Sequence, residues 1–261
     1  MDGPSRGADA NLVEIFASAQ GEGPWVGAET VFVRFGGCDL RCAWCDSPGT
    51  WRPAKSCRIE QTPGSARFRT LPNPLSPDQI DAALGVLAPA GRGFVSLTGG
   101  EPLLQPEAVR AVAERARARG LRAYLETHGL AVDALEAVVA AIDVVSMDWK
   151  LPSDVQRAEP GGASDFAAAH AKFLESAQSA GEVFVKVVVT PNTQDGELEA
   201  VCEAIAAVAR DTTLVLQPVT PFAKVRERPS AQRILGWQRC CAQRLSDVRV
   251  IPQTHRSYEA P

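Results

Sequence analysis

Short apolar runs alternate with longer amphipathic stretches along most of this 261-residue chain. The apolar runs predict strands at 31–35, 93–98, 121–126, 144–148, 183–189 and 213–217, with a last short strand at 248–251. The amphipathic stretches predict helices at 106–119, 132–140, 165–180, 197–209 and about 230–245. One more helix is predicted to begin at Ser76-Pro77-Asp78, where a capping residue precedes a proline of the first turn.

This alternation predicts an α/β fold with a parallel sheet and right-handed crossovers. Six strand–helix units favour a partial, open β/α barrel of about six strands over a closed barrel of eight. The length allows one such domain or at most two small ones, and we expect a single domain over residues 1–261. The segment 51–75 breaks the alternation and is rich in Pro, Arg and Ser, so we expect a surface loop or small insertion there.

Composition and charge narrow the class of protein. The hydrophobic fraction of 45% is ordinary for a globular protein, and no apolar run is long enough to cross a bilayer. The net charge of −4 comes without a dense Lys/Arg block, so we expect neither a nucleic-acid partner nor a membrane partner. The first residues lack the apolar region of a secretory signal, so we expect a cytoplasmic location.

Three cysteines, Cys38, Cys42 and Cys45, stand close together with C-x3-C-x2-C spacing. A closed zinc site needs a fourth ligand, for which Cys57 is the nearest candidate, and a disulfide needs an oxidising compartment. The chain has seven cysteines, an odd number, and clustered cysteines inside a cell favour a metal site. Three thiolates on a 4Fe–4S cluster would leave one iron open to a substrate or cofactor.

Polar residues follow five of the predicted strands. In parallel α/β folds the chemistry lies at the carboxyl ends of the strands, so these residues are expected on one rim together with the cysteines. The turn at 99–102, Gly-Gly-Glu-Pro, has glycines that allow a close approach of the backbone to a ligand, although an ordinary strand-to-helix turn has the same composition. The polar segments are 98–102, 126–129, 146–150, 190–192 and 217–220.

The cysteine spacing resembles that of the radical S-adenosylmethionine (SAM) superfamily. Together with four further segments, it closely resembles the 7-carboxy-7-deazaguanine synthase family over nearly the whole chain, except the first ten residues and the 51–75 segment. Those segments are Glu14-Ile-Phe-Ala-Ser-Ala-Gln-Gly-Glu-Gly, Val31-Phe-Val-Arg-Phe-Gly-Gly-Cys, Cys45-Asp-Ser and Gln253-Thr-His-Arg.

The resemblance implies a radical SAM lyase that is Mg²⁺-dependent and belongs to queuosine and 7-deazapurine biosynthesis. The family converts 6-carboxy-5,6,7,8-tetrahydropterin into 7-carboxy-7-deazaguanine with release of ammonia. An electron from the 4Fe–4S cluster splits SAM, the resulting radical takes hydrogen from C6 of the pterin, and SAM is regenerated. The implied cofactors are the 4Fe–4S cluster, SAM and Mg²⁺, and the implied partners are the pterin, a flavodoxin or ferredoxin donor, and a second copy in a homodimer.

The resemblance also implies roles for individual residues, none of them a catalytic side chain beyond the cluster and SAM. Cys38, Cys42 and Cys45 would hold the cluster, and Ser47 would bind Mg²⁺ where the family usually has threonine. The residues implied to contact the cofactor are Trp44, Asp46, Gly100, Asp148, Trp149, Lys150, Gln217, Pro218, Val219 and Thr220. The residues implied to contact the substrate are Ala19, Gln20, Gly21, Arg34, Thr98 and Pro261.

Plainer interpretations remain open for several of these residues. Arg34 would also serve to anchor the cysteine loop, and Asp148 and Lys150 would also form an ion pair at a strand end. The family often has Leu at Ala19 and Ser-Pro-Lys at 148–150, so these positions depart from its pattern. At the level of the protein, the alternatives are an activase of a glycyl-radical enzyme and a non-catalytic module stabilised by zinc or a cluster.

Overall fold

The computed structural model describes residues 9–159, 161 and 165–257, and within them ten strands form one sheet in the order β12-β11-β10-β8-β7-β6-β2-β1-β4-β5. A separate pair, β3 and β9, pairs antiparallel. The strands are β1 Leu12–Ala19, β2 Glu29–Phe35, β3 Leu40–Cys42, β4 Ser56–Glu60, β5 Phe68–Pro72, β6 Phe94–Gly99, β7 Arg122–Thr127, β8 Val144–Asp148, β9 Val155–Arg157, β10 Glu182–Val189, β11 Thr213–Pro218 and β12 Val248–Val250.

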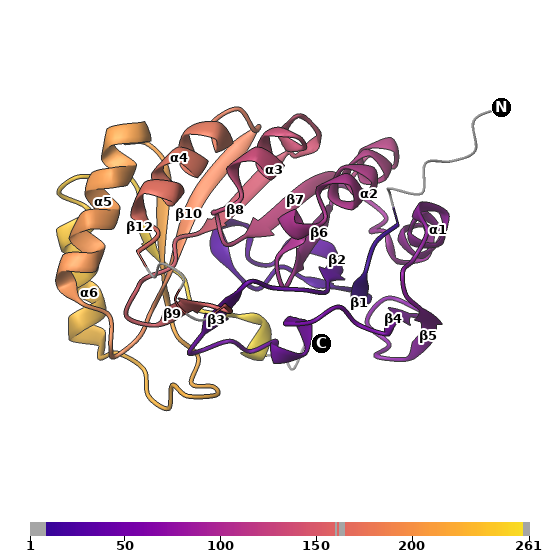
Figure 1. Ribbon diagram of the computed structural model, residues 1–261, viewed down its shortest axis with the longest axis horizontal. Helices are drawn as coiled ribbons and strands as arrows, with labels where there is room; N and C mark the ends of the chain where they lie inside the picture. Colours follow the sequence, from indigo (N-terminus) through magenta and orange to yellow (C-terminus); the bar gives the residue numbers. More distant parts are fainter. Residues whose placement is uncertain (1–8, 160, 162–164, 258–261) are drawn as a thin grey trace.

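All the strands predicted from the apolar runs are present. In sheet order they are β2, β6, β7, β8, β10, β11 and β12, and each pairs parallel with its neighbour. The helices lie along one side of the curved sheet, while β3, β9 and the C-terminal segment lie on the other (Figure 1). The predicted open α/β barrel is confirmed. The helices are α1 Pro77–Leu87, α2 Pro106–Ala118, α3 Val132–Glu136, α4 Ala167–Ala177, α5 Asp195–Ala209 and α6 Ala231–Cys241.

The helices form where local signals and apolar periodicity agree. Ser76 and Gln79 make a reciprocal capping box at the start of α1, as its sequence predicts. The helix predicted at 132–140 is shorter, because α3 ends at Glu136 and a separate 3₁₀ turn follows at Val139–Ala141. The buried faces of the helices and the sheet share the main apolar core. A smaller apolar cluster of strand residues, with Phe94, Tyr124 and Phe184, is buried apart from it.

The segment 51–75 contains structure that the sequence did not predict. Its strands β4 and β5 form a hairpin, and β4 joins the sheet beside β1. Glu60 of β4 is buried, and its carboxylate accepts hydrogen bonds from the backbone N–H of Ala17 at 3.0 Å and of Ala66 at 2.9 Å. The insertion is therefore a sheet extension rather than a surface loop. Among the described residues, none of the helices has the length and apolar character needed to cross a membrane.

Candidate active site

One cavity opens at the carboxyl ends of the parallel strands, and it gathers most of the residues that the sequence singled out. Its wall comes from β1, β2, β6, β7, β8, β10 and β11, together with the cysteine loop and the C-terminal segment. The predicted residues that line it are Ala19, Gln20, Gly21, Arg34, Cys38, Cys42, Trp44, Cys45, Asp46, Ser47, Thr98, Gly100, Asp148, Lys150 and Gln217.

Backbone contacts hold the cysteine loop in place. The N–H of Gly37 donates to the carbonyl of Thr50 at 2.7 Å, and the N–H of Ala43 donates to the carbonyl of Asp154 at 2.8 Å. The guanidinium of Arg41 donates to the carbonyl of Cys38 at 3.0 Å. With these anchors on both sides of the short β3–β9 pair, the three cysteine side chains all face the same cavity.

The three thiols suit a multi-iron cluster better than a single ion. Burial raises the pKa of the Cys38 thiol and raises that of Cys42 to about 11, so bound cationic iron would be needed to keep both as thiolates. Within the described part of the chain, no three His, Cys, Asp or Glu side chains are grouped closely enough for one metal ion. Cys57, the possible fourth zinc ligand, is buried in the main core. Three thiol donors that face one cavity fit a 4Fe–4S cluster, which would receive each thiolate at a separate iron.

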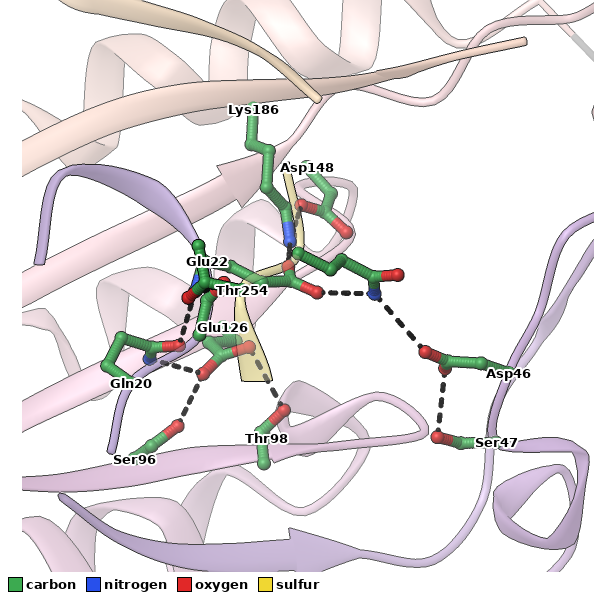
Figure 2. A network of polar contacts seen from close by, with 12 residues as sticks. Gln20, Glu22, Asp46, Ser47, Ser96, Thr98, Glu126, Asp148, Lys186 and Thr254 are labelled. Carbon is green, nitrogen blue, oxygen red and sulfur yellow. Dashed lines mark hydrogen bonds and ion pairs between the residues drawn. The ribbon is translucent and has the colours of Figure 1, made fainter. Parts of the chain in front are cut away.

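A buried series of opposite charges lines the cavity, and Figure 2 shows its members Glu22, Lys186 and Asp148. Lys150 Nζ lies 2.6 Å from Asp148 Oδ2, and Lys186 Nζ lies 3.1 Å from Asp148 Oδ1. Lys186 also pairs with the carboxylate of Glu22. Although burial by itself would raise the pKa of the Asp148 carboxyl, the two ammonium groups hold it below its usual value. All three charged groups of the Lys150–Asp148–Lys186 chain are therefore ionised at neutral pH.

Lys150 connects this series of charged groups to the loop that carries the three cysteines. Its ammonium lies 4.8 Å from the centre of the Trp44 ring, in cation–π geometry. Burial alone would lower the pKa of Lys150, but the carboxylate of Asp148 raises it above its ordinary value. The same ammonium offsets part of the rise that burial causes in the pKa of the Cys42 thiol, so the predicted ion pair at this strand end also acts on the cysteine loop.

A second polar cluster surrounds Glu126, at the end of β7. Its carboxylate accepts hydrogen bonds from Ser96 Oγ at 2.6 Å, Gln20 Nε2 at 3.1 Å and Thr98 Oγ1 at 3.3 Å (Figure 2). The side-chain oxygen of Gln20 in turn accepts from the backbone N–H of Glu22 at 3.1 Å. Two predicted substrate residues, Gln20 and Thr98, are thus brought together although 78 positions separate them in the sequence.

Arg34 points its guanidinium toward this cavity from β2. Its Nε donates to Glu14 Oε1 at 2.9 Å, and its Cζ lies 5.7 Å from the centre of the Phe16 ring. No described residue makes a hydrogen bond to its two terminal nitrogens. Both of these contacts are to β1, and among the described residues a planar pair of donors is left for a ligand.

The Gly-Gly-Glu-Pro turn has a structural reason for its composition. A Cβ on Gly100 would lie 2.0 Å from the carbonyl oxygen of Gly37, which only glycine permits. The fully buried carboxylate of Glu101 accepts from the N–H of Leu103 at 2.9 Å and of His128 at 2.8 Å. The turn therefore ties the end of β6 to the cysteine loop and to the end of β7.

Asp46 and Ser47, which follow the last cysteine, carry oxygen atoms that suit a hard cation or a polar cofactor. Ser47 Oγ donates a hydrogen bond to Asp46 Oδ1 at 3.1 Å (Figure 2). Asp46 Oδ2 accepts one from Gln253 Nε2 at 3.3 Å. The buried Oε1 of Gln217, also in the cavity wall, has no hydrogen-bond partner among the described residues. An unsatisfied buried acceptor is costly, so Gln217 fits a ligand that donates a hydrogen bond.

Some predicted residues lie outside the cavity. Trp149 is buried and packs against His170, with ring centres 4.8 Å apart, so its side chain belongs to the core rather than to the site. Val219 packs against Trp44 in a small apolar cluster and supports the wall from behind. Pro218 and Thr220 are half-buried and are not among the lining residues. Pro261 lies outside the described residues.

Several lining residues were not among the predicted site residues. Lys186 interrupts the apolar run of β10, and a single charge inside a buried strand was the signal that could have identified it. Glu22, Gln253 and His255 occur in the quoted terminal segments, and Glu126 ends a predicted strand, so all four were visible but carried no assigned role.

Comparisons with known proteins agree with this geometry. Residues 32–205 match the Radical SAM superfamily. The chain is 40% identical over 251 residues to the 7-carboxy-7-deazaguanine synthase of Geobacter sulfurreducens, covering 95% of this chain and 96% of that protein. It is 34% identical over 249 residues to the 7-carboxy-7-deazaguanine synthase of Methanopyrus kandleri, covering 94% and 92%. The crystal structure of QueE from Escherichia coli is similar in fold, with a TM-score of 0.61, 21% identity and 95% of each chain covered.

Proposed function

Since the chain belongs to the 7-carboxy-7-deazaguanine synthase family of radical SAM enzymes, we propose that its cavity binds SAM and 6-carboxy-5,6,7,8-tetrahydropterin side by side. The protein is a radical SAM lyase of 7-deazapurine biosynthesis that uses a 4Fe–4S cluster, SAM and a reductant. The family assignment sets aside both the glycyl-radical activase and the non-catalytic module.

The observation that carries the proposal is one cavity with three thiols on one wall and Arg34, Gln20 and Thr98 on another. When bound, the cluster and SAM supply the one-electron chemistry that begins the ring contraction. The protein's own contribution is to hold the two ligands in contact and to keep water away from them.

On the cofactor side, the fixed charges of Lys150 and Asp148 are suited to the amino acid part of SAM. The ammonium of Lys150 lies between Asp148 and the Trp44 ring, where a ligand carboxylate can share it. Gln217 Oε1, which lacks a hydrogen-bond partner among the described residues, would accept from a donor of the ligand. We assign these two residues to SAM, with Asp148 as the carboxylate that keeps Lys150 oriented.

On the substrate side, the guanidinium edge of Arg34 that no described residue occupies suits the carboxylate of the pterin. Gln20 and Thr98 are held by the carboxylate of Glu126, which sets the direction of their remaining hydrogen-bonding groups. The fixed network means that little side-chain freedom is lost when a flat, polar ring binds.

The proposed Mg²⁺ would bind at Ser47. Mg²⁺ is held by oxygen atoms, keeps several waters and often bridges to an anionic substrate. The neighbouring Ser47 hydroxyl and Asp46 carboxylate face the cavity and offer such oxygens, although both are paired with each other in this structure. The departure from threonine at this position keeps the hydroxyl and removes only a methyl group.

The test is anaerobic turnover by cluster-loaded protein with SAM, dithionite and the carboxypterin. We expect ammonia release and the ultraviolet spectrum of a deazapurine, with a rate that rises on addition of Mg²⁺. Ser47→Ala should weaken the response to Mg²⁺, whereas Ser47→Thr should keep it. Absence of both products in wild-type protein with a full cluster would refute the proposal.

The remaining parts of the proposal concern partners and setting. We propose a flavodoxin or ferredoxin as the physiological electron donor, because a one-electron carrier is what the cluster requires. We further propose a single-domain chain that acts in the cytoplasm as a homodimer. Sedimentation of the cluster-loaded protein tests the dimer, and reduction of the cluster by each purified carrier tests the donor.

A further inference from the structure

Lys186 is a buried cation shared by two carboxylates that belong to different walls of the cavity. It lies on β10, is 5% exposed, and is surrounded in the strand by apolar residues. Its Nζ pairs with Glu22, which follows β1, and with Asp148 Oδ1 at 3.1 Å, at the end of β8 (Figure 2). Lys186 and Glu22 are 164 positions apart, so only the fold brings them together.

A buried lysine is costly and is retained only with close partners. The negative groups of Asp148, Glu22 and Glu126 all act on the Lys186 ammonium, and they keep it protonated although burial opposes this. None of its three donors is needed to complete a helix or sheet. The residue therefore serves the arrangement of the two carboxylates around it.

Each carboxylate has a second partner. Asp148 Oδ2 also binds Lys150, which we assign to SAM. Glu22 Oε1 accepts from Gln253 Nε2 at 2.7 Å, and the Glu22 backbone N–H donates to Gln20, which we assign to the substrate. A continuous path of ion pairs and hydrogen bonds thus runs from the cofactor wall to the substrate loop through one ammonium group.

We propose that Lys186 is a positioning residue that couples the binding of SAM to the binding of the pterin. A ligand that engages Lys150 weakens its hold on Asp148, and Asp148 then draws Lys186 away from Glu22. The substrate loop at 20–22 adjusts in response, and binding in that loop acts on the cofactor wall by the reverse path. This inference rests on the proposed assignment of Lys150 and Gln20 to the two ligands.

Such coupling is reciprocal and measurable without turnover. The affinity of anaerobic, cluster-loaded protein for SAM would be measured by calorimetry with and without saturating carboxypterin, in the absence of any reductant. For wild type, we expect the pterin to change the SAM dissociation constant by about 5-fold or more, the lower end of common coupling factors. Lys186→Met should bring this ratio close to one, and Lys186→Arg should keep part of it.

Two further variants serve as controls, one for folding and one for the loss of a lysine charge. Lys186→Met leaves Glu22 without its cation, so the double variant Lys186→Met/Glu22→Gln removes both charges and should fold even if the single variant does not. Lys172→Met, on the exposed face of α4, removes a lysine charge elsewhere and should keep the wild-type ratio. Iron content and circular dichroism would be matched across the series.

The outcomes separate the two hypotheses. A wild-type ratio of one, or an unchanged ratio in a folded variant that lacks Lys186, would overturn the coupling and leave the proposed function intact. Wild-type protein with a complete cluster that binds neither SAM nor the carboxypterin would overturn the proposed function itself. Loss of the ratio in the Lys186→Met variants, with both ligands still bound, supports the inference.

Discussion

Arg34 allows a sharp test of the substrate site, because the structure supplies a matched control. Arg34 and Arg58 both bind the carboxylate of Glu14, through Oε1 at 2.9 Å and Oε2 at 2.5 Å. Only Arg34 lines the cavity; its side chain is 20% exposed, against 56% for Arg58. Replacing each in turn by lysine keeps the charge and changes only the planar fork.

The magnitude follows from the geometry. Arg34 can offer its two terminal nitrogens to a carboxylate while Nε stays on Glu14, whereas lysine offers a single ammonium. Loss of one hydrogen bond to a charged group costs roughly 1.5–3 kcal/mol, which corresponds to about a 10- to 150-fold weaker affinity. We therefore expect Arg34→Lys to raise the KM for the carboxypterin by that factor, with the affinity for SAM changed less than 3-fold.

The assay is steady-state turnover with dithionite, varying the carboxypterin at saturating SAM, together with a direct SAM titration. Arg58→Lys should leave the KM for the carboxypterin within about 2-fold of wild type, since the exposed pair with Glu14 contributes little. Equal losses for both ligands in Arg34→Lys, or equal losses in the two variants, would contradict a role of Arg34 at the substrate carboxylate.

Three other changes test separate parts of the structure. Cys42→Ala should fold but lose iron, sulfide and deoxyadenosine formation from SAM, and retained turnover would contradict its role as a ligand. Gly100→Ala should lower the free energy of unfolding by about 1–3 kcal/mol, because its Cβ would meet the Gly37 carbonyl at 2.0 Å. As a control, a Cβ at Gly49 meets nothing within 4 Å, so in urea unfolding Gly49→Ala should stay within about 0.5 kcal/mol of wild type. Burial lowers the pKa of His170 to about 3, below its ordinary value of 6.5, so its stabilising contribution is complete above pH 6.5 and is lost as the pH falls toward 3. Between pH 7.0 and 5.5 wild type should lose about 1 kcal/mol more than His170→Gln, and parallel urea curves for the two proteins would refute this.

Local sequence was sufficient for the parallel strands and for the grouping of three cysteines in one loop. The parallel strands are short and apolar, and their period and punctuation are properties of neighbouring residues. The cysteines at 38, 42 and 45 lie within one loop, so their common destination needed no knowledge of the fold. The hairpin of β4 and β5 was missed because its exposed face is polar and Arg-rich, and only pairing with β1 makes strands of it.

The site was predicted least well where distant segments meet. Trp149 has the right neighbours in sequence, yet it packs against His170, because alternate residues at a strand end face opposite sides of the sheet. Lys186 lies inside a run of valines, and its partner Glu22 lies far from it in the sequence, near the N-terminus. Such pairs depend on which loops converge at the rim, which no local pattern encodes.

The sequence by itself thus determined the order of the parallel strands and the helices and the presence of three thiols in one loop, since both follow from contacts between near neighbours. Only the tertiary structure decided that Lys186 joins the Asp148 wall to the Glu22 loop, and that Gln253 reaches Asp46 from 207 positions away. The physical reason is that the curved sheet brings the ends of its strands to one rim, where buried charges must find partners from whichever segments are there.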